Sequence, residues 1–413
     1  MTTMTPPTGT GPLARREARL AWGLLFPTIA AVALVVILPL LAIFWISFKP
    51  VGLADLRPPE MVVRADIRGD AEAVGDEITV RYRIRNSNQD KTISGVTLTQ
   101  AWPAGLDPQE VDERCEISGG FIRCDFGDVE GGFRDQIRIP SIVGQDFLDS
   151  GGDLSGEPEV TGEADNILTN SEFTLENFAK VFDSDEFWGV LGVTLFYTIF
   201  GTIGALVFGL FAALLLNKSF RGQGILRGLY LFPYVAPVIA VAFAWILLFD
   251  PFSGSANALL IQMGVTESSI DFFGQRPLAL IMVTIFEIWR YFPLSFLFIL
   301  ARMQSIDTDM YEAADMDGAS PFQIFWSLSM PQLLGILSVL FLLRFIWTFN
   351  KFDDIFLLTG GNAGTRTLTV NVYEQAFAIG NIGAGAAVAV VIFCCLLIFS
   401  FFFFRYGNQE DGL

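Results

Sequence analysis

The sequence predicts a predominantly α-helical protein that crosses a membrane several times and carries a small β-rich insert outside it. The 413-residue chain is 52% hydrophobic and only 17% charged, whereas soluble domains average about 25% charged residues. Acidic residues concentrate in residues 51–186, which hold 29 Asp and Glu against 12 Lys and Arg. The rest of the chain is nearly neutral and contains six long apolar segments. The acidic block is therefore predicted to be a soluble insert in a membrane-spanning body.

The composition excludes several classes of function. The formal net charge of −18 argues against a nucleic-acid partner, because phosphates call for a basic surface. The chain contains no histidine, which rules out a Ser-His-Asp triad, a Cys-His pair and the common histidine-based zinc motifs. No metal site and no catalytic residue are predicted. The mean hydropathy of +0.49 favours contact with a lipid bilayer.

Six segments are long and apolar enough to cross a bilayer core of about 30 Å, which requires about 20 helical residues. They are residues 20–48, 187–217, 228–249, 277–301, 332–350 and 382–404. Four of them contain no charged residue, but the fourth contains Glu287 and Arg290, and the fifth contains Arg344. The predicted body is thus an all-α polytopic membrane protein of six transmembrane helices, with the insert between helices 1 and 2.

The short loops predict the orientation of these helices. Basic residues precede the first span, join the second to the third, and follow the fourth and the sixth: Arg15, Arg16, Arg19, Lys218, Arg221, Arg227, Arg302 and Arg405. With an even number of spans, all of these residues fall on one side of the membrane. An excess of Lys and Arg marks the cytoplasmic side. Both termini are therefore expected in the cytoplasm and residues 51–186 outside it.

Residues 61–142 have the pattern of β-structure. Ile78, Val80, Tyr82 and Ile84 alternate with Thr79, Arg81, Arg83 and Arg85, as in a strand with one buried face. A small antiparallel sandwich, similar to an immunoglobulin domain, is predicted. The three arginines are expected to be a solvated face rather than a binding stripe. Residues 144–170 are predicted to be a linker, and residues 173–187 an amphipathic helix at the membrane surface.

Four cysteines fall into two pairs. Cys115 and Cys124 lie nine residues apart around Ser118-Gly119-Gly120, a spacing that suits a hairpin closed by a disulfide. Such a bond persists in an oxidising compartment, which agrees with an extracytoplasmic insert. Two unpaired thiols are the alternative. Cys394 and Cys395 lie in the last apolar segment, where we expect them to be small packing residues.

One loop, residues 305–331, has strong helix start and stop signals. Asp307 or Thr308 can cap a short helix, and Gly318 can end it in the left-handed conformation. Ser320-Pro321-Phe322-Gln323 then has the pattern of a second helix start. Small Ala313, Ala314 and Ala319 would allow another protein to approach closely. Pro331 is expected to mark the entry to the fifth span.

The same loop resembles the EAA loop of binding-protein-dependent ABC importer permeases. Glu312-Ala313-Ala314 is followed by Gly318 six residues after the Glu and by Pro331 nineteen residues after it. Flanking stretches resemble the carbohydrate branch, which is the MalF-like sugar permease branch; they are Leu175–Phe178, Phe232-Pro233-Tyr234, Trp289–Pro293, Tyr311–Ala319 and Leu357–Gly361. The resemblance covers residues 1–50 and 171–408. It departs from the family pattern at Leu328-Ser329-Met330 and at Asn362-Ala363-Gly364.

This resemblance implies the ABC importer permease fold and a role as a transport subunit rather than an enzyme. The implied partners are a second permease subunit in a heterodimer, two cytoplasmic ATPase subunits, an extracytoplasmic binding protein and a sugar or oligosaccharide. ATP and Mg²⁺ would be bound by the ATPase subunits, so no cofactor is expected in this chain. Gly360–Thr367 has glycines but lacks the lysine of a Walker A loop. The residues implied to couple to the ATPase are Glu312, Ala313, Ala314, Asp317, Gly318, Ala319 and Pro331.

The resemblance also sets the expected layout in a bacterial inner (plasma) membrane. It predicts a cytoplasmic tail at residues 1–19, a first transmembrane helix at 20–50, and an extracytoplasmic β-rich insert with its linker at 51–170. A permease core with helices 2–6 and the coupling loop would follow at 171–408, and a cytoplasmic tail at 409–413.

Charged residues at membrane depth usually face a cavity or a partner, because insertion of each costs about 2.5–3.5 kcal/mol. Glu287 and Arg290 lie three residues apart, so they could neutralise each other or line a polar pathway. Arg344 is expected to be structural and to reach an acid on another span. The residues predicted to form the substrate pathway are Glu287, Arg290, Tyr291, Trp347, Thr348, Asn350 and Lys351. An interfacial belt of aromatic and polar residues is the alternative for the end of the fifth span.

Two other functions remain open at this point. The chain could be a permease for a non-sugar solute, such as a polyol, a sugar phosphate or an osmolyte. It could also be a membrane-anchored receptor or assembly protein with an external β-domain, although an anchor needs neither charged spans nor an EAA-like loop.

Overall fold

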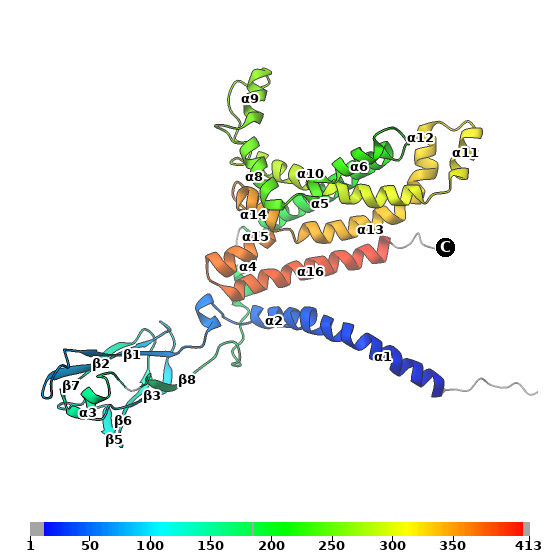
Figure 1. Ribbon diagram of the computed structural model, residues 1–413. Coiled ribbons are helices and arrows are strands. Elements are labelled where there is room, and N and C mark those ends of the chain that lie inside the picture. The colour runs from blue at the N-terminus through cyan, green and yellow to red at the C-terminus, as the bar shows by residue number, and fades with distance from the viewer. Residues whose placement is uncertain (1–11, 155, 184–185, 408–413) are drawn as a thin grey trace, which may run out of the picture. The chain divides into compact units, whose positions relative to one another are not determined.

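The computed structural model describes residues 12–154, 156–183 and 186–407 (Figure 1). The chain forms two compact units. The β unit is Lys49–Thr174, and the helical unit combines Met1–Phe48 with Leu175–Leu413. Residues 1–11 of the predicted N-terminal tail and all of the predicted C-terminal tail, residues 409–413, lie outside the described residues.

The helical unit is built from long apolar helices joined by short ones. Its helices are α1 (Pro12–Val32), α2 (Leu38–Ser47), α4 (Glu176–Phe182), α5 (Phe187–Leu216), α6 (Gln223–Tyr230), α7 (Phe232–Val235), α8 (Val238–Leu248), α9 (Ser255–Gln262), α10 (Leu278–Gln304), α11 (Thr308–Met316), α12 (Pro321–Ile324), α13 (Met330–Phe349), α14 (Asp353–Thr359), α15 (Leu368–Tyr373) and α16 (Ile382–Gly407). Among the described residues, five continuous helical runs are long and apolar enough to cross a membrane. A sixth candidate is a pair of bent helices.

The third predicted span, residues 228–249, is not one continuous helix. Helices α6 and α7 meet α8 at an angle of 91°. The break falls at Ala236 and Pro237, which have extended ψ angles of 143° and 127°. Pro237 has no N–H for a helical hydrogen bond, and it disfavours the helical conformation of Ala236 before it. The expectation of an unbroken third span was therefore wrong.

Helix α5 packs closely against α10 because glycines line their contact. A Cβ atom at Gly201 would lie 2.9 Å from the Glu287 side chain, and one at Gly209 would lie 2.6 Å from Ser295 Cβ. A Cβ atom at Gly204 would lie 2.3 Å from the Ile288 side chain. Small residues let helix backbones approach in a membrane, where lipid supplies no hydrophobic driving force between helices. These glycines thus bring α5 up to the face of α10 that carries Glu287.

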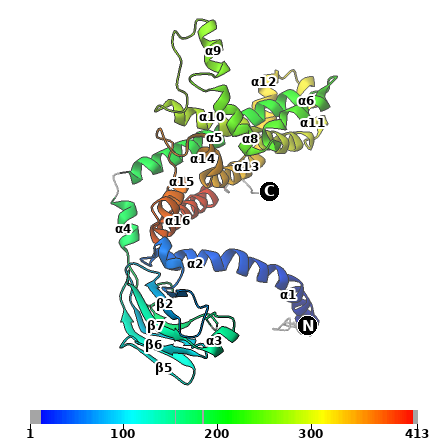
Figure 2. The ribbon, with the colours of Figure 1, turned by 60° about the vertical axis from the view of Figure 1, so that its left-hand side comes forward.

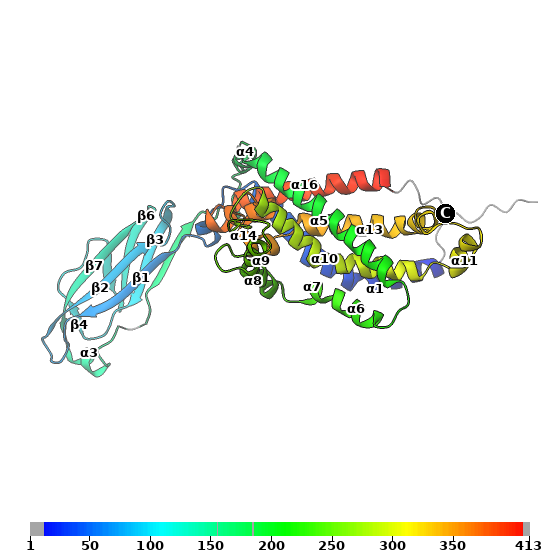
Figure 3. The same ribbon diagram turned by 90° about the horizontal axis from the view of Figure 1, so that it is seen from above.

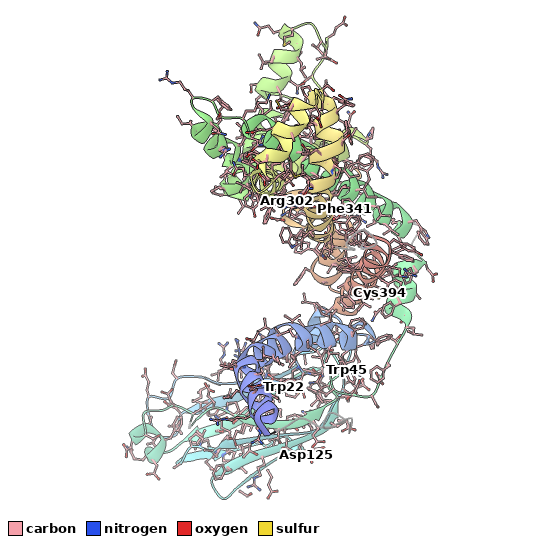
Figure 4. The ribbon with its side chains drawn as sticks, turned by 90° about the vertical axis from the view of Figure 1, so that its right-hand side faces the viewer. Trp22, Trp45, Asp125, Arg302, Phe341 and Cys394 are labelled. Carbon is pink, nitrogen blue, oxygen red and sulfur yellow. A yellow bond between two sulfur atoms is a disulfide. The ribbon has the colours of Figure 1, made fainter. Side chains whose placement is uncertain are left out.

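Aromatic side chains join the last helix to its neighbours. The rings of Phe345 on α13 and Phe399 on α16 stack with centroids 3.7 Å apart. Phe44 on α2 meets Phe393 on α16 edge to face, with centroids 5.7 Å apart. Along the first helical run, Trp22 and Trp45 have largely exposed side chains (Figure 4). Such an apolar surface is what lipid contact requires.

Two predicted helix boundaries were wrong. The helix of the fifth span does not begin near Pro331, because a continuous helical run extends from Pro321 to Phe349 through a π-helical turn at Phe325–Ser329. Pro331 occupies the first turn of α13, and the π turn before it accommodates the missing N–H. The surface helix predicted for residues 173–187 is the seven-residue α4, and α5 starts separately at Phe187.

The β unit is a sandwich of two antiparallel sheets (Figure 2). Its strands are β1 (Met61–Arg68), β2 (Glu77–Asn86), β3 (Ile93–Ala101), β4 (Leu106–Pro108), β5 (Cys115–Ser118), β6 (Phe121–Val129), β7 (Arg134–Val143) and β8 (Glu159–Ala164), with a short helix α3 (Gln145–Asp149). One sheet has the order β1-β2-β7-β4 and the other β5-β6-β3-β8. The β-rich insert is confirmed. The predicted linker, however, contains α3 and β8, and β8 pairs with β3.

The period-2 pattern placed the core correctly. Ile78, Val80, Tyr82 and Ile84 are at most 2% exposed, and they pack with residues of β3, β6 and β7 in one cluster. The strands β5 and β6 form the predicted hairpin. Cys115 lies directly opposite Cys124 in it, and the two form a disulfide. At the base of the unit, Lys49 Nζ donates a 3.0 Å hydrogen bond to Asn170 Oδ1, which joins the incoming and outgoing segments.

Candidate functional site

A buried carboxylate, Glu287 on α10, is the centre of a polar cluster in the helical unit. Arg344 on α13 donates a 2.7 Å hydrogen bond from Nη2 to Glu287 Oε1, and Thr348 donates a 2.9 Å bond to the same oxygen. Tyr197 on α5 donates to Oε2 at 2.9 Å. All four side chains are at most 2% exposed. Three helices are therefore joined through one carboxylate.

The second charged residue of α10, Arg290, does not pair with Glu287. Its guanidinium donates hydrogen bonds of 3.1 Å to the carbonyl of Pro233 and 3.0 Å to the carbonyl of Ala236. These carbonyls lie at the end of α7, where the chain breaks before α8. A cation satisfies carbonyl groups left without partners at a helix C-terminus. Of the two alternatives left open for Glu287 and Arg290, mutual neutralisation is contradicted. The expectation that Arg344 reaches an acid on another span is confirmed.

A further buried acid, Asp354 on α14, completes the charged cluster. It is 0% exposed, and its carboxylate lies 4.0 Å from Arg290 Nε and 3.7 Å from Lys351 Nζ. Within the described part of the chain, neither of its oxygens has a hydrogen-bond partner. The sequence reasoning missed Asp354. The sequence feature that pointed to a buried acid was its position directly before the apolar run Ile355-Phe356-Leu357-Leu358.

A small cavity of about 120 Å³ opens beside this cluster. It is lined by Tyr234, Glu287, Tyr291, Leu294, Arg344, Trp347, Thr348 and Lys351. Two cations lie close to the Tyr291 ring, with Arg344 Cζ 4.7 Å and Lys351 Nζ 4.4 Å from its centroid. The cavity thus presents aromatic faces, charged donors and one carboxylate. That combination suits a polyhydroxylated solute, because sugar C–H faces pack on rings while hydroxyls need hydrogen-bond partners.

The predicted pathway residues are only partly brought together. Glu287, Tyr291, Trp347, Thr348 and Lys351 line the cavity. Arg290 lies behind it and binds the broken helix. Asn350 is exposed and donates its amide to the carbonyl of Ile346 on its own helix, at 2.9 Å. Tyr197 and Tyr234 were missed, because nothing in the local sequence shows which face of a span turns toward a neighbour.

The loop predicted to couple to another protein has the expected caps. Asp307 accepts a hydrogen bond from the Asp309 N–H at the start of α11, and Gly318 follows the helix with φ of +75°. Ser320 and Gln323 form a capping box at the start of α12. Figure 1 shows α11 and α12 together at one end of the helical unit, the end at which α16 also terminates.

Helix α11 is exposed but is held to the body. None of its residues is buried. Tyr311 on α11 and Ser329 at the base of α13 are joined by a hydroxyl–hydroxyl hydrogen bond of 3.1 Å. Arg302 at the end of α10 donates to the Gln332 carbonyl at 3.1 Å, which fixes the two helices that flank the loop (Figure 4). Helix α11 is therefore attached to the base of α13, which is in turn bonded to the end of α10.

The predicted coupling residues lie on or beside this helix. Glu312, Ala313, Asp317, Gly318 and Pro331 are exposed, whereas Ala314 and Ala319 are half-buried. Four large apolar side chains are also exposed around them: Met310, Met316, Phe322 and Trp326. Met310 and Met316 belong to α11, whereas Phe322 and Trp326 belong to the helical run Pro321–Phe349, which is long and apolar enough to cross a membrane.

Comparison with known proteins agrees with this geometry. Residues 205–409 match the family described as "binding-protein-dependent transport system inner membrane component". The inner membrane ABC transporter permease protein YcjO of Escherichia coli is 35% identical over 217 residues, which are 52% of this chain and 73% of that protein. The chain belongs to the binding-protein-dependent ABC permease family. The permease is thus a transport subunit and not itself an enzyme.

Two other relatives have names that specify a solute. The trehalose/maltose transport system permease protein MalF of Thermococcus litoralis is 34% identical to the permease, over 52% of this chain and 73% of that protein. The sn-glycerol-3-phosphate transport system permease protein UgpA of Yersinia pestis is 31% identical over 57% of this chain and 81% of that protein.

The fold of the permease is also that of a solved importer. A structure of a bacterial ABC transporter involved in the import of the acidic polysaccharide alginate superposes with a TM-score of 0.55 at 18% identity, over 59% of this chain and 86% of that one. The family match begins at residue 205, so it includes Glu287, Arg344 and Thr348 of the cluster but neither Tyr197 nor the β unit. The ABC importer permease fold is confirmed, with five or six candidate spans.

Proposed function

We propose that this chain is the permease subunit that forms, with a second permease subunit, the pathway for a sugar or oligosaccharide. An extracytoplasmic binding protein would deliver the solute, and two cytoplasmic ATPase subunits, which bind ATP and Mg²⁺, would drive its passage. The observation that carries the proposal is the lining of the small cavity beside Glu287, which would form one wall of the pathway. Tyr291 and Trp347 offer ring surfaces there, and Thr348 and Lys351 offer polar groups. Names of relatives that mention trehalose, maltose and alginate support a saccharide.

The same proposal gives the charged cluster a mechanical role. Glu287 joins α5, α10 and α13, and Arg290 joins α10 to the break between α7 and α8. The exposed helix α11 lies at the other end of α10 and α13. Docking of α11 in an ATPase subunit would turn a rigid-body motion of that subunit into rocking of these helices. The coupling residues Glu312, Ala313, Ala314, Asp317, Gly318, Ala319 and Pro331 are proposed to make or support that contact.

The proposed topology has six transmembrane helices, with the bent α6–α8 segment as the third. Both termini and α11 would lie in the cytoplasm of a bacterial cell, and the β unit outside it. An introduced cysteine tests this arrangement in a chain that carries Ala in place of Cys394 and Cys395. An impermeant thiol reagent should label Ser94→Cys in the β unit of intact cells, but should label Asp315→Cys on α11 only after lysis. The reverse pattern would invert the topology.

Reconstitution tests the transport function. The permease would be purified with its partner permease and ATPase subunits, placed in proteoliposomes, and supplied with the binding protein. We expect ATP-dependent uptake of a di- or oligosaccharide and no uptake of amino acids. Uptake confined to amino acids or peptides would refute the carbohydrate assignment.

A phosphorylated solute is a second candidate, favoured by one observation. Lys351 and Arg344 both line the cavity, and their charged groups lie 4.4 Å and 4.7 Å from the centroid of the Tyr291 ring. Two cations at one cavity suit a phosphate group. Relatedness to a glycerol-3-phosphate permease points the same way. The uptake panel would therefore include sn-glycerol 3-phosphate, and preference for it over every neutral sugar would select this candidate.

A further inference from the structure

The outer face of one sheet of the β unit carries a dense group of arginines, which we call the arginine face. Alternation along β2 turns Ile78, Val80, Tyr82 and Ile84 inward, so Arg81, Arg83 and Arg85 point outward. Strands β1 and β7 lie on either side of β2 in this sheet (Figure 3). Their register with β2 places further arginines on the same face. The complete set is Arg64, Arg68, Arg81, Arg83, Arg85, Arg134 and Arg138.

The register places like charges directly opposite one another. Arg64 lies across from Arg83, Arg85 across from Arg134, and Arg81 across from Arg138. Directly opposed like charges destabilise a sheet. The segment 51–186 holds only 12 basic residues against 29 acidic ones, yet seven of the 12 are on this face. Solubility does not require them there, because the segment already carries a large net charge of the opposite sign.

Resident counter-ions neutralise only part of the arginine face. Asp66 accepts a 3.0 Å hydrogen bond from Arg81 Nε and lies 3.3 Å from Arg68 and 3.7 Å from Arg83. The hydrogen bond from Arg81 holds the pKa of the Asp66 carboxyl below its usual value, so this acid stays ionised. Within the described residues, no ion pair or hydrogen bond is made by the guanidinium groups of the other four: Arg64, Arg85, Arg134 and Arg138.

The arginine face is also hollowed. A groove of about 560 Å³ is lined by Val62, Arg64, Arg83, Ile84, Arg85, Arg134, Asp135 and Gln136. Arg64 and Arg83 also border a second hollow, so the charged surface continues beyond the groove. The groove volume lies in the range of small-ligand sites, about 300–1,000 Å³. Four of its eight lining side chains are arginines, and one, Asp135, is already paired with Arg114 at 2.7 Å.

We propose that the arginine face binds an acidic oligosaccharide outside the cell. A guanidinium forms bidentate hydrogen bonds with a carboxylate. Alternate residues along a strand and residues on neighbouring strands lie about 5–7 Å apart, so the arginines form an array that can contact several carboxylates of one extended chain. The negative charge of the ligand follows from the arginines. Its carbohydrate nature rests on the proposed function, in which this chain transports a saccharide.

An acidic protein is a poorer fit to this surface. Protein interfaces depend on a few buried aromatic or aliphatic anchors at their centre. Among the described residues of the β unit, the large apolar side chains that are exposed are Leu53, Leu56, Val74, Phe121 and Phe173. None of them belongs to β1, β2 or β7. A flexible chain held by charge needs no such anchor.

Binding to the full-length protein tests the proposal. The permease would be placed in nanodiscs of zwitterionic lipid and titrated into a fluorescent hexamer of galacturonic acid, with the neutral galactose hexamer as a second probe. We expect the acidic hexamer to bind, binding to weaken as salt is raised, and the neutral hexamer not to bind. Replacing Arg85 and Arg134 together by Gln should weaken binding about tenfold or more, and replacing both by Lys should weaken it less.

A matched control separates the arginine face from total charge. Replacing Arg57 and Arg123 by Gln removes the same charge from the β unit, but Arg123 lies on β6 of the other sheet and Arg57 on neither. This variant should bind like wild type. Equal loss in both variants, or no binding of the acidic hexamer to wild type, would overturn the proposal. So would arginine-dependent binding of polyglutamate or of anionic vesicles without binding of the hexamer. None of these outcomes would affect the transport function, which uptake measures separately.

Discussion

Arg344 and Glu287 form a buried ion pair that joins α13 to α10, with 2.7 Å between Nη2 and Oε1. The two residues are 57 positions apart in the sequence, and they are only 2% and 1% exposed. A buried pair of this kind adds little net stability over apolar residues of the same size, but loss of one partner leaves an uncompensated charge. The main effect of the pair is therefore to determine which faces of α10 and α13 pack against each other.

The first prediction concerns this pair. Glu287→Ala leaves Arg344 buried without its acidic partner. We therefore expect the free energy of unfolding to fall by about 3–5 kcal/mol, and the melting temperature in detergent to be lower. The double variant Glu287→Ala with Arg344→Ala should recover part of that loss. Thr348→Val, which removes one hydrogen bond to the same carboxylate, should cost only about 1–3 kcal/mol. A double variant no more stable than Glu287→Ala would show that the two side chains are not coupled.

The second prediction concerns the glycine that brings α5 close to Glu287. A Cβ at Gly201 would come within 2.9 Å of Glu287 Cγ, so Gly201→Val should push the helices apart and destabilise the unit by about 1–3 kcal/mol. Gly192→Val on the same helix is the control, because no described residue outside its own helical turn lies within 4 Å of the position of its Cβ. Thermal unfolding monitored by cysteine reactivity would measure both. If both variants lowered the stability equally, the lost stability would be due to helix propensity rather than to packing against α10.

The third prediction distinguishes the side chains of the cavity. Lys351→Met and Tyr291→Ala should lower solute uptake, because both residues line the cavity and contact each other. Asn350→Ala should have little effect, since Asn350 is exposed and bonded to its own helix. Uptake kinetics in proteoliposomes, with assembly checked by gel filtration, give the comparison. If Asn350→Ala reduced uptake as much as Lys351→Met, the pathway would have to extend over the outer surface of α13.

The fourth prediction concerns coupling through α11. Gly318 has a positive φ and open space around its Cβ position, so Gly318→Ala should cost about 1–2 kcal/mol through backbone conformation alone. Gly318→Pro and Glu312→Lys should insert normally but lose ATP-driven uptake. Gly335→Ala is the control, because it lies in α13, also with open space and with an ordinary φ. Wild-type stimulation of ATPase activity in Gly318→Pro and Glu312→Lys would mean that α11 is only a connector.

The fifth prediction concerns the pH dependence of the β unit. Hydrogen bonds from Arg114 lower the pKa of the Asp112 carboxyl from its ordinary value of 3.8 to about 2. A depressed pKa means that the ionised acid stabilises the folded state above pH 4, and that this stabilisation is lost as the pH falls from 4 toward 2. Because both side chains are partly exposed, the contribution should stay below about 1 kcal/mol. Asp112→Asn should therefore lower the melting temperature at pH 6 but not at pH 2. Glu113→Gln is the control, and an equal effect of Asp112→Asn at both pH values would contradict the prediction.

The arginines of β2 illustrate what a single strand does not reveal. Their alternation with apolar residues predicted correctly that they face outward. Their interpretation as a solvated face depended on one strand alone. The register of β1 and β7 then placed Arg64, Arg134 and Arg138 against them. Strand pairing joins residues that are far apart in the sequence, so no local sequence pattern predicts which arginines lie opposite one another.

The sequence by itself determined the features that arise from neighbouring residues. Runs of apolar residues predicted the long helices, alternation predicted the core of the sandwich, and Asp307, Gly318 and Ser320 predicted the caps of α11 and α12. The nine-residue spacing of Cys115 and Cys124 predicted their disulfide. Hydrogen-bond caps, helical periodicity and hairpin turns act over a few residues, and for this reason they can be read along the chain.

Only the tertiary structure decided which charges meet. Glu287 and Arg290 are neighbours on one helix, yet Glu287 binds Arg344 and Arg290 binds the carbonyls of Pro233 and Ala236. Which charges pair depends on the orientation of each helix about its own axis, on the glycines that set the distance between α5 and α10, and on the bend before α8. Asp354 became part of the cluster because α14 folds back against these helices. A buried charge interacts with the groups that helix packing places within a few ångströms of it. Those groups can come from any position in the sequence.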